Sequence, residues 1–362
     1  MFGVLDLVLF LRLKEINYFY IVLHNITIQE YLVSSAPLID VRSPGEFQQG
    51  HIPGAVNVPL FSNDERAHIG TVYVRRSRDE AMQIGYDYAN PKKQWFIDEV
   101  RKVAPDGPVV VHCWRGGMRS RLFAEHLNEN GFENVSVITG GYKSWRRLLN
   151  EHWKKPHQLV ILGGYTGSGK TPVIKRLTET GHQAVDLEAL ACHKGSAFGA
   201  IGQKPQPTTE QFENDLYEIW RNFDPSRPVW LEDESRNIGH VQLPADLFAQ
   251  MRDAVTFFLD IPRSVRAEYL VQDYAAAGTD DLRNSVLKIS KRLGGQNVNQ
   301  ALQWLDEGKL YEVAYLSLSY YDKAYMRGLG FHDNKKVVMI SAESIDAKKN
   351  TELILLEYER RK

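Results

Sequence analysis

The stretch that decides the fold is VVVHCWRGGMRS, residues 109–120. Its first residues are β-branched, as in a buried strand, and residues 122–127 have the apolar spacing of a helix. Between them lies a tight, glycine-containing turn that carries Cys113, Arg115 and Arg119. Backbone N–H groups and the positive end of a helix dipole stabilise a thiolate there and can also hold a phosphate-like anion. We therefore expect Cys113 to be a nucleophile, assisted by the two arginines and facing an open basin.

The rest of this turn is the expected anion cradle, and its members are Gly116, Gly117, Met118 and Ser120. A buried structural cysteine is the simpler alternative, but it leaves the two arginines without a purpose. The string His112-Cys113-x-x-Gly116-x-x-Arg119-Ser120 also fits cysteine-dependent phosphatases, in which the arginine clamps a phosphate. Such an enzyme needs a general-acid aspartate on a separate loop, and no aspartate in the sequence stands out for that role.

Length and composition describe an ordinary globular chain of two domains. It has 362 residues, of which 43% are hydrophobic and 25% charged, with a net charge of −1. Cys113 and Cys192 are its only cysteines, which excludes a disulfide scaffold or a cysteine-rich zinc site and suits the cytoplasm. Residues 1–25 are interpreted as a leader or start-site extension, because their apolar runs are too short for a membrane anchor.

Strands that alternate with helices predict a parallel sheet with helices on both faces. LIDVRSPGEFQQGHIPGAVNVPL (38–60), the cysteine turn and ITGGYKSW (138–145) together resemble a rhodanese domain, expected over 26–150. That resemblance implies a carrier of sulfur or selenium as a cysteine persulfide or perselenide. We expect Asp40, Arg42, Glu46 and His51 to shape this domain rather than to take part in chemistry.

A linker is expected over 151–157, followed by a P-loop NTPase-like α/β domain over 158–362. Its first strand, 159–163, runs into GYTGSGKT (164–171), a complete G-x-x-x-x-G-K-[ST] motif. Lys170 would meet the outer phosphoryl oxygens and the Thr171 hydroxyl can hold Mg²⁺. The remaining residues of the expected phosphate loop are Gly164, Gly167, Ser168 and Gly169.

Two later features bear on this second site. Glu232 and Asp233 end a predicted strand and are either partners for a metal or an ordinary acidic strand end. Arg263 and Arg266 resemble the arginines of nucleotide kinases, and they either meet phosphates or are solvated. The rest, 266–329, is expected to be mostly helical. Its tyrosines are expected in the core, with base stacking as the alternative; they are Tyr315, Tyr320, Tyr321 and Tyr325.

A thiol-carrier domain fused to a P-loop domain is an uncommon pairing. From about residue 26 onward the chain resembles the tRNA 2-selenouridine synthase family. Beyond the two generic motifs, the strings that carry this resemblance are NDERAHIGTVY (63–73), VDLEALACHKGSAFG (185–199), WLEDESRNIG (230–239), KRLGG (291–295) and YYDKAY (320–325). Cys192 stands where the family pattern has a basic residue, so we treat it as incidental.

The resemblance implies replacement of the sulfur of a wobble 2-thiouridine in tRNA by selenium from selenophosphate. Geranyl diphosphate would first place a geranyl group on that sulfur. Cys113 would carry selenium as a perselenide, Arg115 and Arg119 would hold the departing phosphate, and no cofactor would be tightly bound. The P-loop would hold either geranyl diphosphate or a nucleotide. A sulfurtransferase, a nucleotide kinase fusion and a non-enzymatic tRNA-binding module remain alternatives.

Local basic clusters would bind the tRNA phosphates, because the net charge is close to zero. These clusters are 75–78, 146–147, 154–155 and 360–362.

Overall fold

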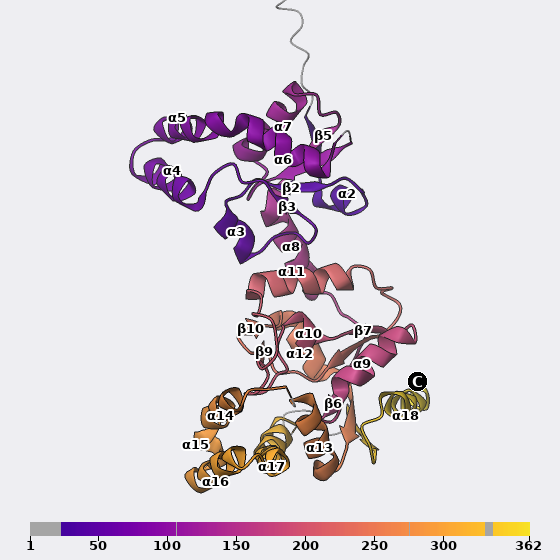
Figure 1. The fold of residues 1–362 in the computed structure, drawn as a ribbon. Coiled ribbons are helices and arrows are strands. Elements are labelled where there is room, and N and C mark those ends of the chain that lie inside the picture. The colour runs from indigo at the N-terminus through magenta and orange to yellow at the C-terminus, as the bar shows by residue number, and fades with distance from the viewer. Residues whose placement is uncertain (1–22, 106, 275, 330–335) are drawn as a thin grey trace, which may run out of the picture. The chain divides into compact units, whose positions relative to one another are not determined.

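The computed structural model describes residues 23–105, 107–274, 276–329 and 336–362 (Figure 1). The chain divides after Asn150 into two compact units. Most of the expected leader, residues 1–22, lies outside the described residues. His24 and Asn25 were also assigned to that leader, but both belong to a strand, where they pair with Ser136 and Val137. The first unit therefore starts earlier than the sequence indicated.

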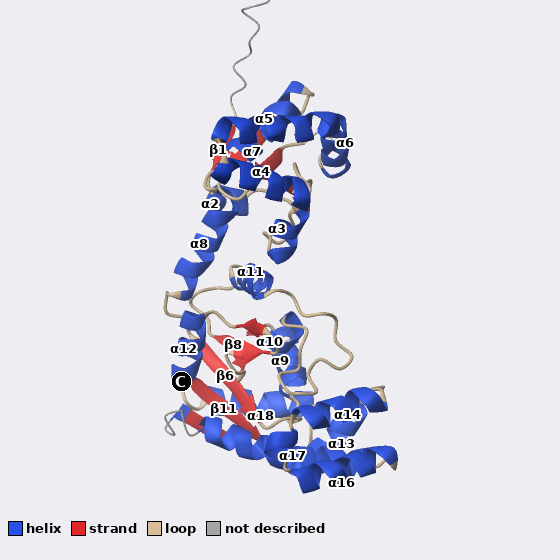
Figure 2. Cartoon of the chain, turned by 90° about the vertical axis from the view of Figure 1, so that its left-hand side faces the viewer, coloured by secondary structure: helices blue, strands red, loops and turns tan. Residues whose placement is uncertain are grey.

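The first unit is a sheet of parallel strands with its connecting helices packed against it (Figures 1 and 2). In spatial order the strands are β1 (His24–Ile26), β5 (Val135–Ile138), β4 (Val109–His112), β2 (Leu38–Asp40) and β3 (Val56–Asn57). The helices are α2 (Ile28–Leu32), α3 (Pro44–Gln49), α4 (Asn63–Arg75), α5 (Arg78–Ala89), η1 (Asn90–Lys92), α6 (Lys93–Val103), α7 (Met118–Glu129) and α8 (Gly141–Trp153). The predicted α/β fold is confirmed.

Local sequence explains how the first strands and helices of this unit are fixed. Ser43 caps α3 and accepts a hydrogen bond from the N–H of Glu46, whose carboxylate accepts one from the N–H of Ser43. Just before this helix, the fully buried Arg42 donates to the Asp40 carboxylate at 2.6 Å and to the Gly50 carbonyl at 2.7 Å. This ion pair ties the end of β2 to the turn after α3, which is the shaping role expected of Asp40 and Arg42.

The second unit contains another parallel sheet, with the phosphate-loop strand at its centre (Figure 2). In spatial order its strands are β12 (Val337–Ser341), β11 (Val255–Asp260), β6 (Leu159–Gly164), β8 (Val229–Glu232) and β7 (Gln183–Val185). A short antiparallel pair, β9 (Asn237–Ile238) and β10 (Val241–Gln242), lies apart from it. The helices near this sheet are α9 (Lys170–Glu179), α10 (Leu187–Leu190), α11 (Thr209–Trp220), α12 (Ala245–Asp253), α13 (Arg263–Asp273) and α18 (Ala347–Glu359).

The stretch expected as a linker is partly structured. α8 continues to Trp153, so three of the seven residues in 151–157 are helical. The indole of Trp153 is 2% exposed, and its ring contacts those of Tyr217 and Trp220 on α11. Trp153 lies beyond the division after Asn150, so this aromatic contact belongs to the second unit.

The helical C-terminal part predicted over 266–329 is confirmed. Besides α13 it comprises α14 (Thr279–Lys288), α15 (Ser290–Leu293), α16 (Gly295–Asp306) and α17 (Leu310–Leu329). Their apolar faces share one cluster, which includes Leu282, Val286, Leu293, Val298 and Ala301. Across the ranges that the structure describes, no helix combines the length and the apolar character needed to cross a membrane.

Candidate active site

The cysteine turn sits at the carboxyl end of β4, between β5 and β2 in the sheet. Its shape depends on two glycines that face each other. A Cβ on Gly116 would lie 2.2 Å from the Ile138 carbonyl oxygen, and a Cβ on Gly141 would lie 2.2 Å from the Cys113 carbonyl oxygen. Both glycines also have positive φ, +63° and +54°. The GG pair of ITGGYKSW thus allows the start of α8 to press against the cysteine turn.

The start of α8 also orients the backbone of this turn. The N–H of Tyr142 donates to the Cys113 carbonyl and that of Lys143 to the Trp114 carbonyl, each at 2.9 Å. On the other side of the turn, the N–H groups of Arg115 and Ser120 donate to the Cys113 sulfur. Backbone donors therefore converge on the thiol, as the strand–turn–helix pattern indicated.

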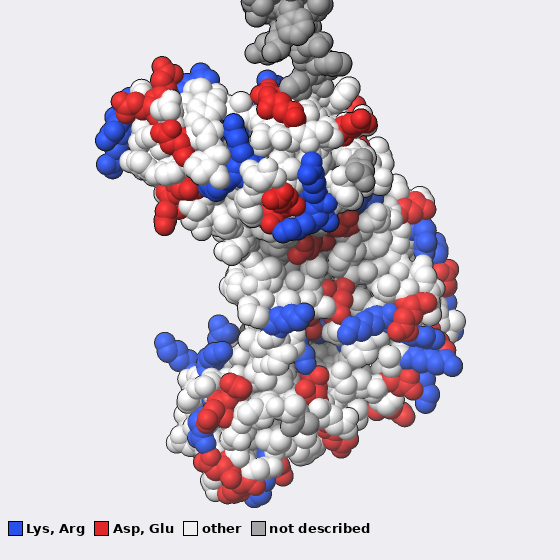
Figure 3. All heavy atoms as spheres, turned by 45° about the horizontal axis from the view of Figure 1, so that its top comes forward, with Lys and Arg blue, Asp and Glu red and all other residues white. Residues whose placement is uncertain are grey.

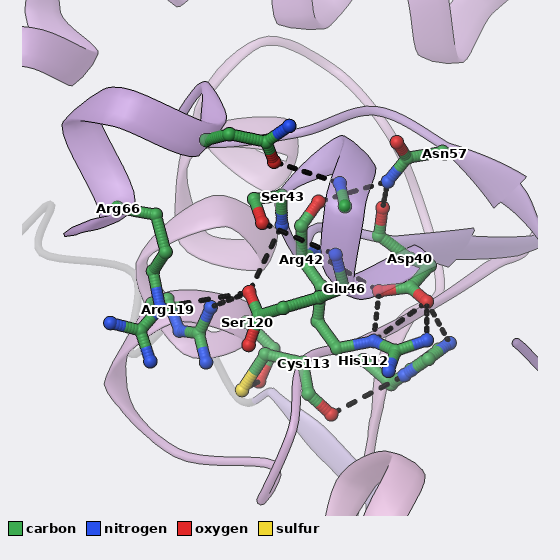
Figure 4. A network of polar contacts seen from close by, with 12 residues as sticks. Asp40, Arg42, Ser43, Glu46, Asn57, Arg66, His112, Cys113, Arg119 and Ser120 are labelled. Atoms are coloured by element: carbon green, nitrogen blue, oxygen red, sulfur yellow. Dashed lines mark hydrogen bonds and ion pairs between the residues drawn. The ribbon is translucent and has the colours of Figure 1, made fainter. Parts of the chain in front are cut away.

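The Cys113 thiol is held in a form that favours ionisation. Burial alone raises its pKa, but the Ser120 hydroxyl, the charge of Arg119 and the backbone donors outweigh burial. The pKa of Cys113 therefore lies below its usual range. The Ser120 oxygen lies 3.3 Å from the sulfur and 3.1 Å from the Gly117 carbonyl oxygen (Figure 4). A lowered pKa increases the thiolate fraction at neutral pH, and the thiolate is the reactive form.

Access to this sulfur differs from the expectation. The Cys113 side chain is only 3% exposed and belongs to an apolar cluster that includes Phe61, Phe96 and Phe123. The open basin expected in front of it is therefore absent in this conformation of the described residues. The turn or the aromatic side chains beside it must therefore move slightly before a substrate can contact the sulfur.

The two arginines of the turn do not converge. Nη1 of Arg119 lies 3.1 Å from Oε2 of Glu46, and Nε of Arg66 on α4 lies 3.6 Å from the same oxygen (Figure 4). Burial acts to raise the pKa of Glu46, but Arg119, the N–H of Ser43 and Arg66 together lower it. The side chain of Arg115 is exposed and has no ion-pair partner among the described residues. Glu46, expected only to shape the domain, is thus the direct partner of a candidate site residue.

The phosphate loop joins β6 to α9 in the second unit. Gly167 and Gly169 have φ of +77° and +75°, and a Cβ on Gly169 would lie 2.6 Å from the Ile345 side chain. The Ser168 side chain is 1% exposed, and its hydroxyl oxygen has no hydrogen-bond partner among the described residues. Buried polar groups are normally hydrogen-bonded, so an unpaired hydroxyl inside this loop fits an anion bound there.

Lys170 and Thr171 follow at the start of α9. Nζ of Lys170 lies 3.3 Å from the Gly164 carbonyl oxygen. Burial lowers its pKa, but the carboxylates of Glu234, Glu188 and Glu232 more than compensate, so the pKa is raised and the lysine keeps its charge. The Thr171 hydroxyl lies within hydrogen-bond distance of Glu232 Oε1, at 2.8 Å, and of Glu188 Oε2, at 3.1 Å.

The carboxylates near Lys170 crowd one another, and this crowding raises the pKa of two of them. Burial, Glu188 and Asp186 raise the pKa of Glu232 to about 8, and burial and Glu188 raise that of Glu234 well above its usual range. A bound cation would relieve this repulsion. Within the described ranges no three His, Cys, Asp or Glu side chains form a ready-made metal site. The hard oxygens of Thr171, Glu232 and Glu188 nevertheless fit Mg²⁺, which commonly takes few protein ligands together with water and substrate phosphates.

Asp233, the other acid named from the sequence, points elsewhere. Its carboxylate accepts hydrogen bonds from the Tyr325 hydroxyl and, at 3.3 Å, from Arg252. The N–H of Gly164 in turn donates to the Tyr325 oxygen at 3.4 Å. Asp233 therefore supports the phosphate loop through Tyr325.

A cavity of about 670 Å³ opens in front of the phosphate loop. Its lining includes Lys170, Thr171, Glu188, Glu234 and Tyr325. A second, smaller pocket of about 60 Å³ shares five lining residues with it: Thr166, Ser196, Leu270, Tyr274 and Tyr321. The other walls of this small pocket are mostly apolar, and they include Leu282, Leu305, Leu310, Val313 and Leu318. A charged phosphate site thus borders an apolar recess.

Arg266 supports the phosphate loop. Its guanidinium donates to the Thr166 carbonyl at 3.1 Å and to both oxygens of the Asp322 carboxylate. It is 2% exposed, so the solvated alternative is wrong for this residue. Arg263 joins the same carboxylate at 3.0 Å.

Comparison with known proteins fits this pairing of sites. Residues 157–352 match the family described as the tRNA 2-selenouridine synthase AAA domain, and residues 27–148 match the rhodanese-like domain. The chain belongs to the tRNA 2-selenouridine synthase family. A tRNA 2-selenouridine synthase from Bdellovibrio bacteriovorus is 34% identical over 81% of this chain and 89% of its own length. One from Sulfurovum sp. is 33% identical over 87% and 95%.

Coverage differs among relatives in this family. A tRNA 2-selenouridine synthase from Nitrosomonas europaea is 37% identical over 67% of this chain, but the match spans 64% of the relative, slightly less than two thirds.

The sequence did not reveal the roles of several residues in this family member. Glu188 lies within hydrogen-bond distance of the Thr171 hydroxyl, but nothing in the string VDLEALACHKGSAFG marked it as a partner of the phosphate loop. Tyr325 and Asp322 come from α17 and support the phosphate loop from far along the chain. Both residues lie in YYDKAY, a string that has no obvious role in a generic sulfurtransferase or kinase. That was the only sign in the sequence that they take part in function.

Proposed function

We propose that this chain replaces the sulfur of a wobble 2-thiouridine in tRNA by selenium from selenophosphate, through an S-geranyl intermediate made with geranyl diphosphate. Family membership supports the reaction as a whole. The assignment of the two steps rests on the chain having two distinct anion sites. The second unit would transfer the geranyl group, and the first would exchange sulfur for selenium.

One observation carries the choice of geranyl diphosphate over a nucleotide as the ligand of the P-loop. The diphosphate would lie among the N–H groups of 164–171 with Lys170, and Thr171 and Glu232 would hold any Mg²⁺. Beside it, the recess is walled mostly by apolar side chains such as Leu282, Leu305 and Val313, and its few polar side chains carry hydroxyls rather than the amide or carboxylate groups suited to the edge of a nucleobase. With about 60 Å³, the recess would take the end of an isoprenoid chain whose first carbons lie in the larger cavity.

Geranylation has a clear chemical purpose in this scheme. A thiocarbonyl sulfur is a poor leaving group, whereas an alkylated sulfur can leave as a thiolate once selenium adds at the ring carbon. The lowered pKa of Cys113 supports its role as the nucleophile of the selenium step. Selenium in selenophosphate is at the selenide level, so a perselenide on Cys113 also requires a thiol–disulfide couple to accept two electrons on loading and return them on delivery.

The tRNA would be held by local cation groups. On the face drawn in Figure 3, lysines and arginines lie among acidic side chains rather than in one broad basic field. Several clusters named from the sequence are partly paired, for example Arg76 with Glu80 and Lys154 with Glu151. Arg75 and Arg78 have no ion-pair partner among the described residues. We place the reaction in the cytoplasm, where tRNA and reduced thiols are available.

The two steps can be separated by two substitutions in the full chain. Cys113→Ser should abolish selenium incorporation and leave S-geranylation of a 2-thiouridine RNA intact. Lys170→Ala should slow geranylation about 100-fold or more, because it removes the cation that meets the diphosphate. Both products are measured by mass analysis of RNA nucleosides. Cys192→Ser and Lys348→Ala are the matched controls and should behave as the parent chain.

The same assay tests the choice of donor. Dimethylallyl diphosphate has the same diphosphate but half the chain, so it should be a poorer donor than geranyl diphosphate. Excess ATP should compete only weakly. Geranylation that survives Lys170→Ala would assign the P-loop to another ligand, and loss of both steps in Cys113→Ser would contradict the division of labour.

A further inference from the structure

The first unit contains a large apolar groove that neither step described above uses. It holds about 740 Å³, within the range of about 300–1,000 Å³ typical of pockets for small organic ligands. One wall is the α4–α5 helical hairpin, and the other is formed by α6 and α7 (Figure 1). Apolar side chains dominate its lining, among them Ile69, Tyr73, Met82, Phe96, Leu122 and Phe123. The string NDERAHIGTVY, which has no role in a generic sulfurtransferase, supplies part of this wall.

One end of the groove meets the cysteine turn. Met118 and Arg119 close that turn, begin α7 and line the groove. The groove residues Phe61 and Phe123 belong to the same apolar cluster as Cys113. A molecule lying in the groove would therefore have its end next to the turn that carries the reactive sulfur.

Exposure and charge indicate what kind of molecule fits. Tyr73, Val74 and Met118 are 59%, 83% and 40% exposed, an unusual amount of apolar surface in one place. Arg66 and Arg119 stand at the end near the cysteine turn, and Arg78 stands on the rim. An apolar chain attached to an anionic polymer matches this arrangement, because the chain needs the lining and the polymer needs the cations.

We propose that this groove binds the geranyl chain of the S-geranyl-2-thiouridine tRNA while its base reacts near Cys113. The inference rests on the proposed function, since it needs the S-geranyl intermediate. The outer selenium of the Cys113 perselenide adds at C2 of the base, the C2–S bond breaks, and its electron pair leaves with the sulfur as geranylthiolate, which takes up a proton. The thiol of the thiol–disulfide couple then supplies two electrons that cleave the S–Se bond, so selenium stays on C2 and Cys113 returns to the thiolate. The groove holds the leaving group in place and aligns C2 with the cysteine turn. A chain entering between the aromatic side chains also supplies the displacement that uncovers Cys113.

The test uses two synthetic anticodon stem–loop RNAs, one with S-geranyl-2-thiouridine and one with S-methyl-2-thiouridine. The same C2–S bond breaks in both, so their kcat/KM ratio in selenation by the full chain isolates the contribution of the chain. Met82→Glu places a charge in the groove and should lower this ratio about tenfold or more, mainly through KM. Gln83→Glu places the same charge one residue away, outside the groove lining, and should keep the parent ratio.

A second variant at the same position controls for the possibility that Met82→Glu does not fold. Met82→Trp keeps an apolar side chain but fills the groove, so it should disfavour the geranyl RNA while accepting an S-dimethylallyl RNA of half the chain length. An unchanged geranyl-to-methyl ratio in both Met82 variants would overturn the groove assignment, as would a parent chain that does not distinguish the two RNAs. Selenation of neither RNA by the parent chain would instead refute the proposed function itself.

Discussion

Arg119 interacts with two groups, the Glu46 carboxylate and the Cys113 sulfur, so its contact with Glu46 bears on the pKa of Cys113. Its charge helps to lower the pKa of the thiol, while its guanidinium is ion-paired with Glu46. A carboxylate partner offsets part of the positive potential that the sulfur experiences. Binding of an anionic substrate would change that balance, because a phosphate group can replace Glu46 as the partner of Arg119.

Glu46→Gln should therefore lower the pKa of Cys113 further, and Arg119→Gln should raise it. Glutamine retains the capping contact at the start of α3, so the change acts chiefly on charge. The pH profile of Cys113 alkylation by iodoacetamide, followed by mass spectrometry in a Cys192→Ser background, should shift to lower pH in the first variant and to higher pH in the second. At neutral pH the first should react a few-fold faster.

Arg115→Gln is the control for this pair, because the Arg115 side chain is exposed and only its backbone N–H reaches the sulfur. A shift in Arg115→Gln as large as the one in Arg119→Gln would mean that net charge, rather than the Glu46–Arg119 contact, governs the thiol.

At the scale of elements, the cysteine turn and the start of α8 form one interlocked unit. Gly141→Ala would force a Cβ into the Cys113 carbonyl at a position with φ of +54°. We expect a loss of about 2–4 kcal/mol in the free energy of unfolding of the first unit, since strain and a backbone clash act together. Gly54→Ala is the matched control: its φ is +82°, but a Cβ there meets nothing within 4 Å, so it should cost only about 1 kcal/mol.

Thermal unfolding and Cys113 alkylation would measure the two effects of Gly141→Ala. The alkylation profile should move toward that of an ordinary thiol, because the turn would no longer direct its N–H groups at the sulfur. A variant with full stability and an unchanged profile would show that α8 does not shape the turn.

This interlock also shows what the sequence could and could not reveal. The cysteine turn and the phosphate loop were predictable because their N–H groups belong to consecutive residues, and the flanking strand and helix are local as well. Glu188, Tyr325 and the Glu46–Arg119 contact were not, because each depends on which distant elements meet. The burial of Cys113 also depends on distant elements, since Phe61 and Phe96 come from separate segments of the chain.

At the scale of the whole chain, the two sites lie in units that each have their own sheet and core. If each unit performs one step, the intermediate that links the steps is an RNA rather than a group bound to the protein. Such an intermediate can leave one molecule and bind another. Two defective chains should then restore the reaction when they are mixed.

We expect Cys113→Ser to geranylate a 2-thiouridine RNA but stop there, and Lys170→Ala to selenate only RNA that already carries the geranyl group. A mixture of the two, supplied with geranyl diphosphate, selenophosphate and a thiol–disulfide couple, should form 2-selenouridine from 2-thiouridine RNA, whereas neither does so alone. Restored activity should rise with the concentration of Lys170→Ala protein, because capture of the released RNA is bimolecular. If the mixture stays inactive although Lys170→Ala selenates synthetic S-geranyl RNA, the intermediate passes between units of one chain without release.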